Sequence, residues 1–137
     1  MAADGVLILP DTSSWIEYLR RSERPADLAL DAAIAAGEAV VVTDVVLMEL
    51  LAGARTDERY ARISRLMGTF EFLPIESPAD FVAAADLYRR CRAAGVTIRA
   101  QTDCLIAAVA IRAGARLLHQ DRDFEALARH SALQLYL

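Results

Sequence analysis

Lysine is absent from this chain of 137 residues, so all fifteen basic residues are arginine. Phosphate binding would therefore depend on the planar guanidinium group, which makes paired hydrogen bonds to phosphate oxygens. Only two histidines are present, so a metal site would be built mainly from oxygen ligands. The two cysteines lack CxxC spacing, and we expect Cys91 and Cys104 to be buried free thiols.

Long apolar stretches are also absent. No segment approaches the roughly 18 consecutive apolar residues of a membrane-spanning helix. The first residues, Met1-Ala2-Ala3-Asp4-Gly5, lack the basic start of a signal peptide. These features predict a cytoplasmic protein without membrane contact, and the length predicts a single domain over residues 1–137.

The chain is nevertheless rich in apolar residues, which make up 55% of the sequence and give a mean hydropathy of +0.28. This is more than one small core requires, and it predicts a homodimer with an additional apolar groove for a partner. The net charge of -4 argues against a general coating of nucleic acid. A local basic groove remains compatible with it, because clustered acidic metal ligands would contribute much of the negative total.

Short apolar runs alternate with helical segments throughout the chain. The runs that lie before, between or after the helices are Val6–Pro10, Ala39–Thr43, Phe70–Ile75, Arg116–His119 and Ala132–Leu135. Helices are expected from the Ser14 and Glu17 capping-box pattern to about Arg21, and then over 25–37, 44–53, 57–67, 78–94, 102–113 and 124–129. This order predicts an α/β fold: a parallel sheet of about five strands with helices on both faces, in three layers. Ligands bind at the carboxyl ends of the strands in such folds.

Four acidic residues occupy positions that this architecture would bring together. Asp11 and Asp121 follow apolar runs, whereas Glu49 and Asp103 lie in apolar helical segments. Burial of a lone carboxylate is unfavourable, so these contexts indicate a shared cation. Hard carboxylate oxygens favour Mg²⁺ or Mn²⁺. The four positions therefore predict a metal-dependent enzyme that acts on phosphates.

Each carboxylate also has an ordinary structural explanation. Asp11 is placed to cap the following helix, and Asp103 lies in a first helical turn, where the helix dipole favours an anion. Asp121 and Asp123 are common turn residues, and Glu49 is compatible with partial exposure at a rim. Independent caps and turns need not converge, whereas a metal site requires convergence at one edge of the sheet.

Four segments resemble the acidic motifs of PIN-domain ribonucleases and, more narrowly, of VapC toxins from VapBC toxin-antitoxin modules. In chain order they are Leu9-Pro10-Asp11-Thr12-Ser13-Ser14-Trp15, Met48-Glu49-Leu50-Leu51-Ala52-Gly53-Ala54, Thr102-Asp103-Cys104-Leu105-Ile106-Ala107-Ala108 and Asp121-Arg122-Asp123-Phe124. The resemblance covers essentially the whole chain and implies catalytic and metal-binding roles for Asp11, Glu49, Asp103 and Asp121. It implies a further metal ligand in Asp123. One departure is His119, where similar chains often carry threonine.

The resemblance implies a Mg²⁺-dependent endoribonuclease, with Mn²⁺ able to substitute, that is the toxin of a type II toxin-antitoxin system. It implies cleavage of structured RNA by a metal-activated water, leaving a 5′-phosphate and a 3′-hydroxyl without a covalent enzyme intermediate. Glu49 would orient or deprotonate the attacking water. A cognate VapB-type antitoxin would pack against Trp15, Tyr18 and Leu19, unless those residues belong to the core.

Three further residues are hypothesised to contact the RNA substrate. Ser13 and Thr12 would do so through their hydroxyl groups, with helix capping as the alternative role. Arg99 would contact the RNA through its guanidinium, because its sequence neighbour Asp103 places it near the metal. Exposure on a solvated helix face is the alternative for this arginine.

Two other functions compete with the ribonuclease. A Mg²⁺-dependent phosphatase or phosphotransfer domain also places aspartates at strand ends, but it would want a lysine near its pocket, and the chain has none. A catalytically silent PIN-like binding module would have lost one of the four acids. All four are present.

Overall fold

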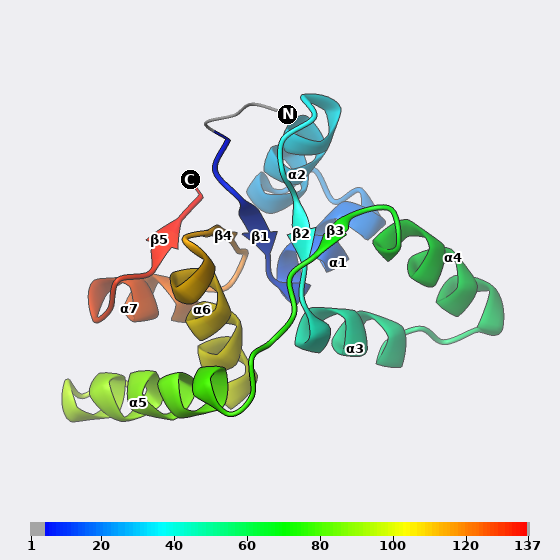
Figure 1. Cartoon of the computed structure of the whole chain (residues 1–137). Coiled ribbons are helices and arrows are strands. Elements are labelled where there is room, and N and C mark those ends of the chain that lie inside the picture. Colours follow the sequence, from blue (N-terminus) through cyan, green and yellow to red (C-terminus); the bar gives the residue numbers. More distant parts are fainter. Residues whose placement is uncertain (1–4, 137) are drawn as a thin grey trace.

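The computed structural model describes residues 5–136 as five short strands and seven helices (Figure 1). The expectation drawn from Met1-Ala2-Ala3-Asp4-Gly5 falls almost entirely on residues outside this range, as residue 137 also does. Within the described range, no helix combines the length and apolar character needed to cross a membrane. In chain order the elements are β1 (Ile8–Pro10), α1 (Thr12–Arg20), α2 (Pro25–Ala35), β2 (Val41–Val42), α3 (Asp44–Ala52), α4 (Asp57–Met67), β3 (Glu71–Phe72), α5 (Ala79–Ala93), α6 (Gln101–Ala113), β4 (Arg116–Leu118), α7 (Asp123–Arg129) and β5 (Gln134–Leu135).

All strand pairs are parallel, as the sequence predicts. β1 pairs with β4, β4 with β5, and β2 with β3. An isolated parallel bridge between Ile8 and Val40 connects the two groups, so the strands follow the order β3-β2-β1-β4-β5 across the molecule. The expected five strands are present, but hydrogen bonding divides them into a three-stranded and a two-stranded sheet.

The division arises at one peptide group between β1 and β2. Ile8 N–H donates to the Ala39 carbonyl at 2.8 Å, which begins a ladder between the two strands. The next residue of β1 that faces β2 is Pro10, because successive residues of a strand bond to opposite sides, and proline has no N–H to donate. The ladder therefore stops after one bridge, although β1 and β2 remain neighbours.

The strands are shorter than the apolar runs that predict them. The run 70–75 forms a strand only at Glu71 and Phe72, both of which are exposed. This strand lies at the edge of the two-stranded sheet and pairs only with β2. The pairing ends where β2 gives way to α3: the Leu73 N–H still donates to the Val42 carbonyl at 2.8 Å, but the Ile75 N–H donates to the Asp44 side chain at 2.8 Å.

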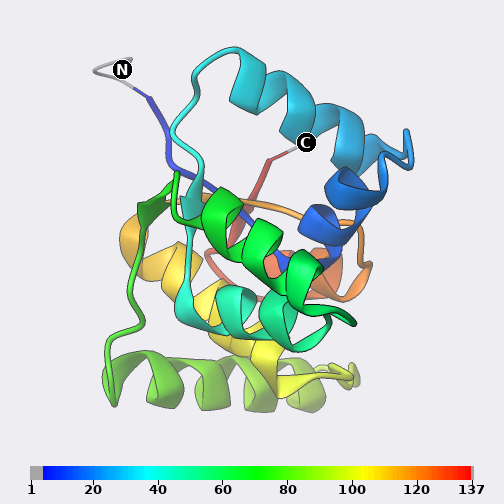
Figure 2. The same ribbon diagram turned by 90° about the vertical axis from the view of Figure 1, so that its right-hand side faces the viewer.

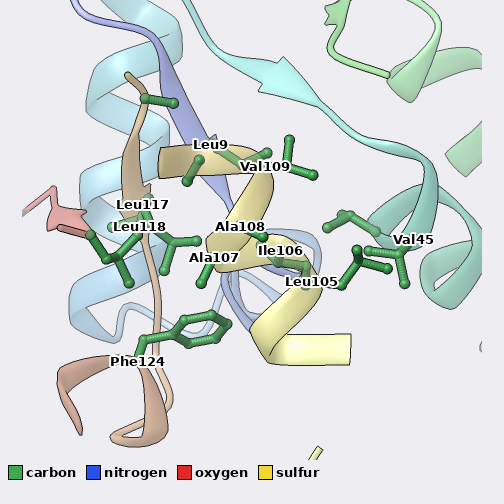
Figure 3. Packing of buried hydrophobic residues seen from close by; sticks show 14 of the residues in the cluster. Leu9, Val45, Leu105, Ile106, Ala107, Ala108, Val109, Leu117, Leu118 and Phe124 are labelled. Carbon is green, nitrogen blue, oxygen red and sulfur yellow. The ribbon is translucent and has the colours of Figure 1, made fainter. Parts of the chain in front are cut away.

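Helix α6 forms the centre of the core. Seven consecutive residues, 104–110, are buried, because this helix is apolar on all sides and is packed on all of them. Figure 3 shows Leu9, Leu117 and Leu118 from the strands, and Phe124 from α7, around this helix. The two cysteines are buried free thiols, as expected, and burial raises the pKa of each.

Helices lie on both faces of the strands. Figures 1 and 2 show α1 and α2 on one side and α6 on the other, with α5 packed against α6. The carboxyl ends of β1, β2 and β4 lead into the region between α1, α3, α6 and α7 (Figure 1). The site predicted from the sequence would be formed in this region.

The start of α1 differs from the expectation. Asp11 is the N-cap, because its side chain accepts a hydrogen bond from the Ser14 backbone N–H at 2.8 Å. Ser14 lies within the first turn and is fully buried, so the predicted capping box of Ser14 and Glu17 is wrong. The aspartate competes successfully for the cap because its carboxylate reaches the free amide directly.

Candidate active site

Three carboxylates meet beyond the carboxyl end of β4. Asp103 comes from the first turn of α6, Asp121 from the loop after β4, and Asp123 from the start of α7. One oxygen atom from each side chain lies within 4.8 Å of the other two. This spacing brings three anionic ligands close enough to share one cation. Asp123, which the sequence alone left between a metal ligand and a turn residue, is therefore part of the cluster.

The pKa of Asp103 shows that the other two acids also belong to this region. Burial, followed by repulsion from neighbouring carboxylates, raises it from 3.8 to about 7. The neighbours responsible are Asp121, Asp11, Asp123 and Glu49. Four carboxylates are thus near enough to Asp103 to influence it, although only Asp121 and Asp123 form the tight group with it. Such a cluster favours either partial protonation or a bound cation.

Asp11 is held rigidly and is only 3% exposed. Burial raises its pKa, while hydrogen bonds from Ser13 and Ser14 act in the opposite direction. The Ser13 hydroxyl lies 2.7 and 2.8 Å from its two carboxylate oxygens, and the Ser14 hydroxyl lies 2.8 Å from one of them. Asp11 therefore caps α1 and contributes to the acidic site at the same time, so the two roles are not alternatives.

The two serines also join Asp11 to the end of β4. The Ser14 hydroxyl lies 2.8 Å from the Leu118 carbonyl, which also accepts the Asp11 N–H at 2.9 Å. The Ser13 hydroxyl accepts the Gln120 N–H at 3.1 Å. Protein groups therefore engage both hydroxyls. Sequence reasoning assigned Ser14 only to a capping box and missed its contacts with Asp11 and with the end of β4.

Glu49 lies at the opposite side of the site, on α3. Its side chain accepts a hydrogen bond of 2.5 Å from the Thr12 hydroxyl. This bond ties α1 to α3 and fixes where the half-buried carboxylate points. Glu49 is outside the three-carboxylate group but close enough to raise the pKa of Asp103. The structure thus gives Thr12 a positioning contact.

Arg99 forms ion pairs with two acids of the cluster. Its Nη2 lies 2.7 Å from Asp121, and its Nε lies 3.0 Å from Asp123. Its backbone N–H also donates to Asp123 at 3.2 Å. Bonding to both acids raises the pKa of the guanidinium above its usual range. Sequence reasoning placed Arg99 near the metal site but missed this pairing with Asp121 and Asp123.

His119, the departure from the resembling motifs, lies between the site and the core. It follows β4 directly, and its ring packs against Phe124 with centroids 5.8 Å apart. Its buried Nδ1 has no hydrogen-bond partner among residues 5–136. The ring therefore packs on Phe124 and is also close enough to Asp11 to oppose the rise in the pKa of that carboxyl.

Comparison with known proteins agrees with this geometry. The PIN domain family matches residues 8–130. Ribonuclease VapC11 of Mycobacterium tuberculosis is 40% identical over 129 residues, which cover 93% of this chain and 96% of the relative. VapBC2 from Rickettsia felis, solved bound to a promoter DNA fragment, has a TM-score of 0.76 at 18% identity, covering 96% of this chain and 98% of that one. VapC20 of Mycobacterium tuberculosis, a sarcin-ricin loop cleaving toxin, has a TM-score of 0.65 at 20% identity, with coverages of 93% and 98%.

A three-layer fold with parallel strands and an acidic cluster at their carboxyl edge is that of a PIN-domain nuclease, and the chain belongs to this family. Its sequence identity to VapC ribonucleases over most of its length defines the class more narrowly. It is a VapC-type endoribonuclease of the toxin-antitoxin class. The resemblance predicted from the four acidic motifs is confirmed.

Proposed function

We propose that this chain is a Mg²⁺-dependent toxin that cleaves structured RNA, with Mn²⁺ able to replace Mg²⁺. The observation that carries the metal requirement is the convergence of Asp103, Asp121 and Asp123 within 4.8 Å. Burial of Asp103, together with repulsion from its neighbouring carboxylates, raises its pKa to about 7, and a divalent cation would relieve this repulsion. The preference for structured RNA is supported by the sarcin-ricin loop specificity of VapC20.

The donor set fits a hard divalent cation. All five side chains offer carboxylate oxygens, which Mg²⁺ and Mn²⁺ prefer to nitrogen or sulfur ligands. The three clustered acids, Asp103, Asp121 and Asp123, would hold the ion together with Asp11 and Glu49, which lie close to Asp103. When bound, the ion supplies Lewis-acid chemistry, lowering the pKa of water and offsetting the negative charge of a phosphodiester.

The remaining work is done by the arrangement of the side chains. Thr12 fixes Glu49 so that its carboxylate can orient or deprotonate the attacking water. Ser13 and Ser14 fix Asp11 relative to β4, which keeps the acids from moving apart under their mutual repulsion. Direct attack by water leaves a 5′-phosphate and a 3′-hydroxyl on the RNA, without a covalent intermediate.

The competing functions account less well for the site. A phosphatase or phosphotransfer domain would use a lysine beside its aspartates, and this chain contains no lysine. A silent binding module would have no reason to retain four carboxylates that repel the charge of Asp103. Removal of any one of them would relieve electrostatic strain.

Chelation tests the metal requirement directly. We expect the purified protein to cleave a stem-loop RNA in Mg²⁺ or Mn²⁺, and cleavage to fall to background in excess EDTA. Carboxylates alone repel an anionic phosphodiester, and only a cation reverses the sign of the local field. Gel electrophoresis of the RNA products reports the result, with restoration by added Mn²⁺ as the control. Undiminished cleavage by the chelated protein would contradict the proposal.

A VapB-type antitoxin is the proposed protein partner. A groove of about 700 Å³ runs beside α1, α2 and α4, and Tyr18, Leu19, Leu28 and Ile63 supply its apolar surface. Trp15, predicted either to line this groove or to belong to the core, is fully buried against Tyr18 and Phe70. Tyr18 and Leu19 thus remain candidates for antitoxin contact, while Trp15 is a core residue.

We also propose a homodimer in the cytoplasm, where its RNA substrate would be found. Helix α5 exposes Phe81 and Val82, at 50% and 58%, which is costly for a protein that stays monomeric. Light scattering of the purified chain should therefore give the mass of two chains at micromolar concentration. A monodisperse monomer would contradict this expectation without affecting the ribonuclease proposal.

A further inference from the structure

Arg99 occupies oxygen atoms that a metal ion would need. Asp121 and Asp123 are two of the three members of the tight carboxylate group. They are also the two acids that the Arg99 guanidinium contacts, at 2.7 and 3.0 Å. A carboxylate oxygen that accepts a charge-assisted hydrogen bond has less negative charge available for a cation. The arginine and a divalent ion therefore draw on the same ligands.

The guanidinium can leave these acids without disturbing the core. The Arg99 side chain is 64% exposed and lies just before α6. Its backbone N–H bonds separately to Asp123 at 3.2 Å, so the chain at this point is held even when the side chain moves. Water competes for the exposed guanidinium and weakens both ion pairs, although the Asp123 carboxylate itself is buried.

Two roles for this contact are physically distinct. As a clamp, Arg99 would pre-organise Asp121 and Asp123, and its removal would weaken metal binding. As a competitor, it would neutralise the acids only while no ion is present, and its removal would strengthen metal binding. The competitor role follows from charge. A divalent cation among three carboxylates is attracted more strongly than a monovalent guanidinium that contacts two of them.

We propose that Arg99 is an internal competitor of the divalent cation, released from Asp121 and Asp123 when the ion binds and then free to contact a phosphate of the RNA. This inference rests on the metal-dependent function proposed above. The hypothesised contact of Arg99 with the substrate would then form only after metal binding. The same side chain would bond to Asp121 and Asp123 in the metal-free protein and to the RNA in the metal-bound protein.

The affinity for Mn²⁺, measured by calorimetry without RNA, distinguishes the two roles by sign. We expect Arg99→Ala to bind Mn²⁺ roughly five-fold more tightly than the unaltered protein, as loss of two exposed ion pairs predicts. Arg122→Ala is the matched control. Arg122 is exposed, lies between the two acids in sequence and makes no salt bridge within residues 5–136, so its removal deletes the same charge without freeing a ligand.

Weaker or unchanged Mn²⁺ binding by Arg99→Ala would overturn the inference, and so would an equal gain in Arg122→Ala. A failure of the unaltered protein to bind Mn²⁺ at all would instead overturn the proposed metal-dependent function. The two failures are therefore distinguishable within a single set of titrations.

A spectroscopic measurement on the unaltered protein avoids any dependence on folding of the variant. The ¹⁵N resonance of the Arg99 Nε–H, assigned by its loss in Arg99→Lys, should shift on addition of Mg²⁺, as the bond to Asp123 breaks. A resonance that stays in place while Mg²⁺ binds would overturn the release step.

The substrate part of the proposal has its own readout. At saturating Mg²⁺, we expect Arg99→Ala to raise the KM for a stem-loop RNA about ten-fold with little change in kcat, because a phosphate contact made equally in the ground and transition states is lost. An unchanged KM would overturn the phosphate contact, whereas the competitor role would stand or fall with the Mn²⁺ affinities.

Discussion

Asp103→Asn is expected to reduce RNA cleavage by about a thousandfold while stabilising the metal-free protein at about pH 8. The loss of activity follows from removing one of the three anionic ligands in the tight group. The gain in stability follows from the pKa of this side chain, which burial and four neighbouring carboxylates raise from 3.8 to about 7. Asp103 thus lowers the stability of the metal-free fold, and its contribution is to the metal site.

The sign of the pH dependence follows from proton binding. Between pH 3.8 and about 7 the folded protein holds a proton on Asp103 that the unfolded chain has lost. Stability therefore falls as pH rises through this window and is constant above it, as far as this group is concerned. An asparagine cannot ionise, so the stability of the variant does not fall in this way as the pH rises. Because Asp103 is partly solvent-exposed and its repulsion is screened, we expect a gain of only about 3–5 °C in Tm.

Thermal unfolding in EDTA at about pH 5 and about pH 8 measures the effect. Asp86→Asn is the control, because Asp86 is exposed on α5 and lies outside the acidic cluster. The control should leave Tm unchanged at both values. A variant at Asp103 that is less stable than the unaltered protein at the higher pH would contradict the expected repulsion.

Asp11→Ala should remove both RNA cleavage and the toxicity of the expressed protein, but at a cost in stability. The carboxylate caps α1 and accepts hydrogen bonds from two serines, so its loss should destabilise the fold by about 1–2 kcal/mol. This differs from the expectation for Asp103, where burial and repulsion both disfavour the charged carboxylate. Repulsion among the acids would by itself favour an unchanged or more stable fold on removal of Asp11, and the capping geometry reverses that expectation.

Asp11→Asn separates the two contributions of this residue. Asparagine is as good an N-cap as aspartate, so this variant should keep most of the stability while losing the ligand charge and the cleavage. Urea unfolding, growth of expressing cells and RNA cleavage together report the outcome. Toxicity that persists in either variant would show that Asp11 is not part of the catalytic site.

The general architecture could be predicted because local signals were consistent with one another. The helix at Asp57–Met67 has the predicted bounds, since Thr56 caps it and Gly68 ends it. The parallel strands followed from apolar runs alternating with helices. The break between β1 and β2 could not be predicted, because it depends on which side of β1 Pro10 faces, and the pairing of β1 with β4 on the other side fixes that.

The acidic residues of the site could be predicted from the sequence, but the hydrogen bonds and ion pairs that they accept could not. The four acids stood out because each lay at a strand end or in an apolar helix. The bonds from Thr12 to Glu49 and from Arg99 to Asp121 join residues distant in sequence. Such contacts leave no periodicity or spacing in the sequence, so only the folded arrangement reveals which hydroxyl or guanidinium each carboxylate receives.

The pairing of β1 with β4 sets the order in which this enzyme can mature during its own synthesis. The first strand can pair with β4 only after residues 116–118 have been added, and Asp121 and Asp123 follow those residues. Contacts between such distant segments form late in folding. A partly synthesised chain that stops before residue 121 therefore lacks two of its three clustered ligands and cannot assemble the acidic site.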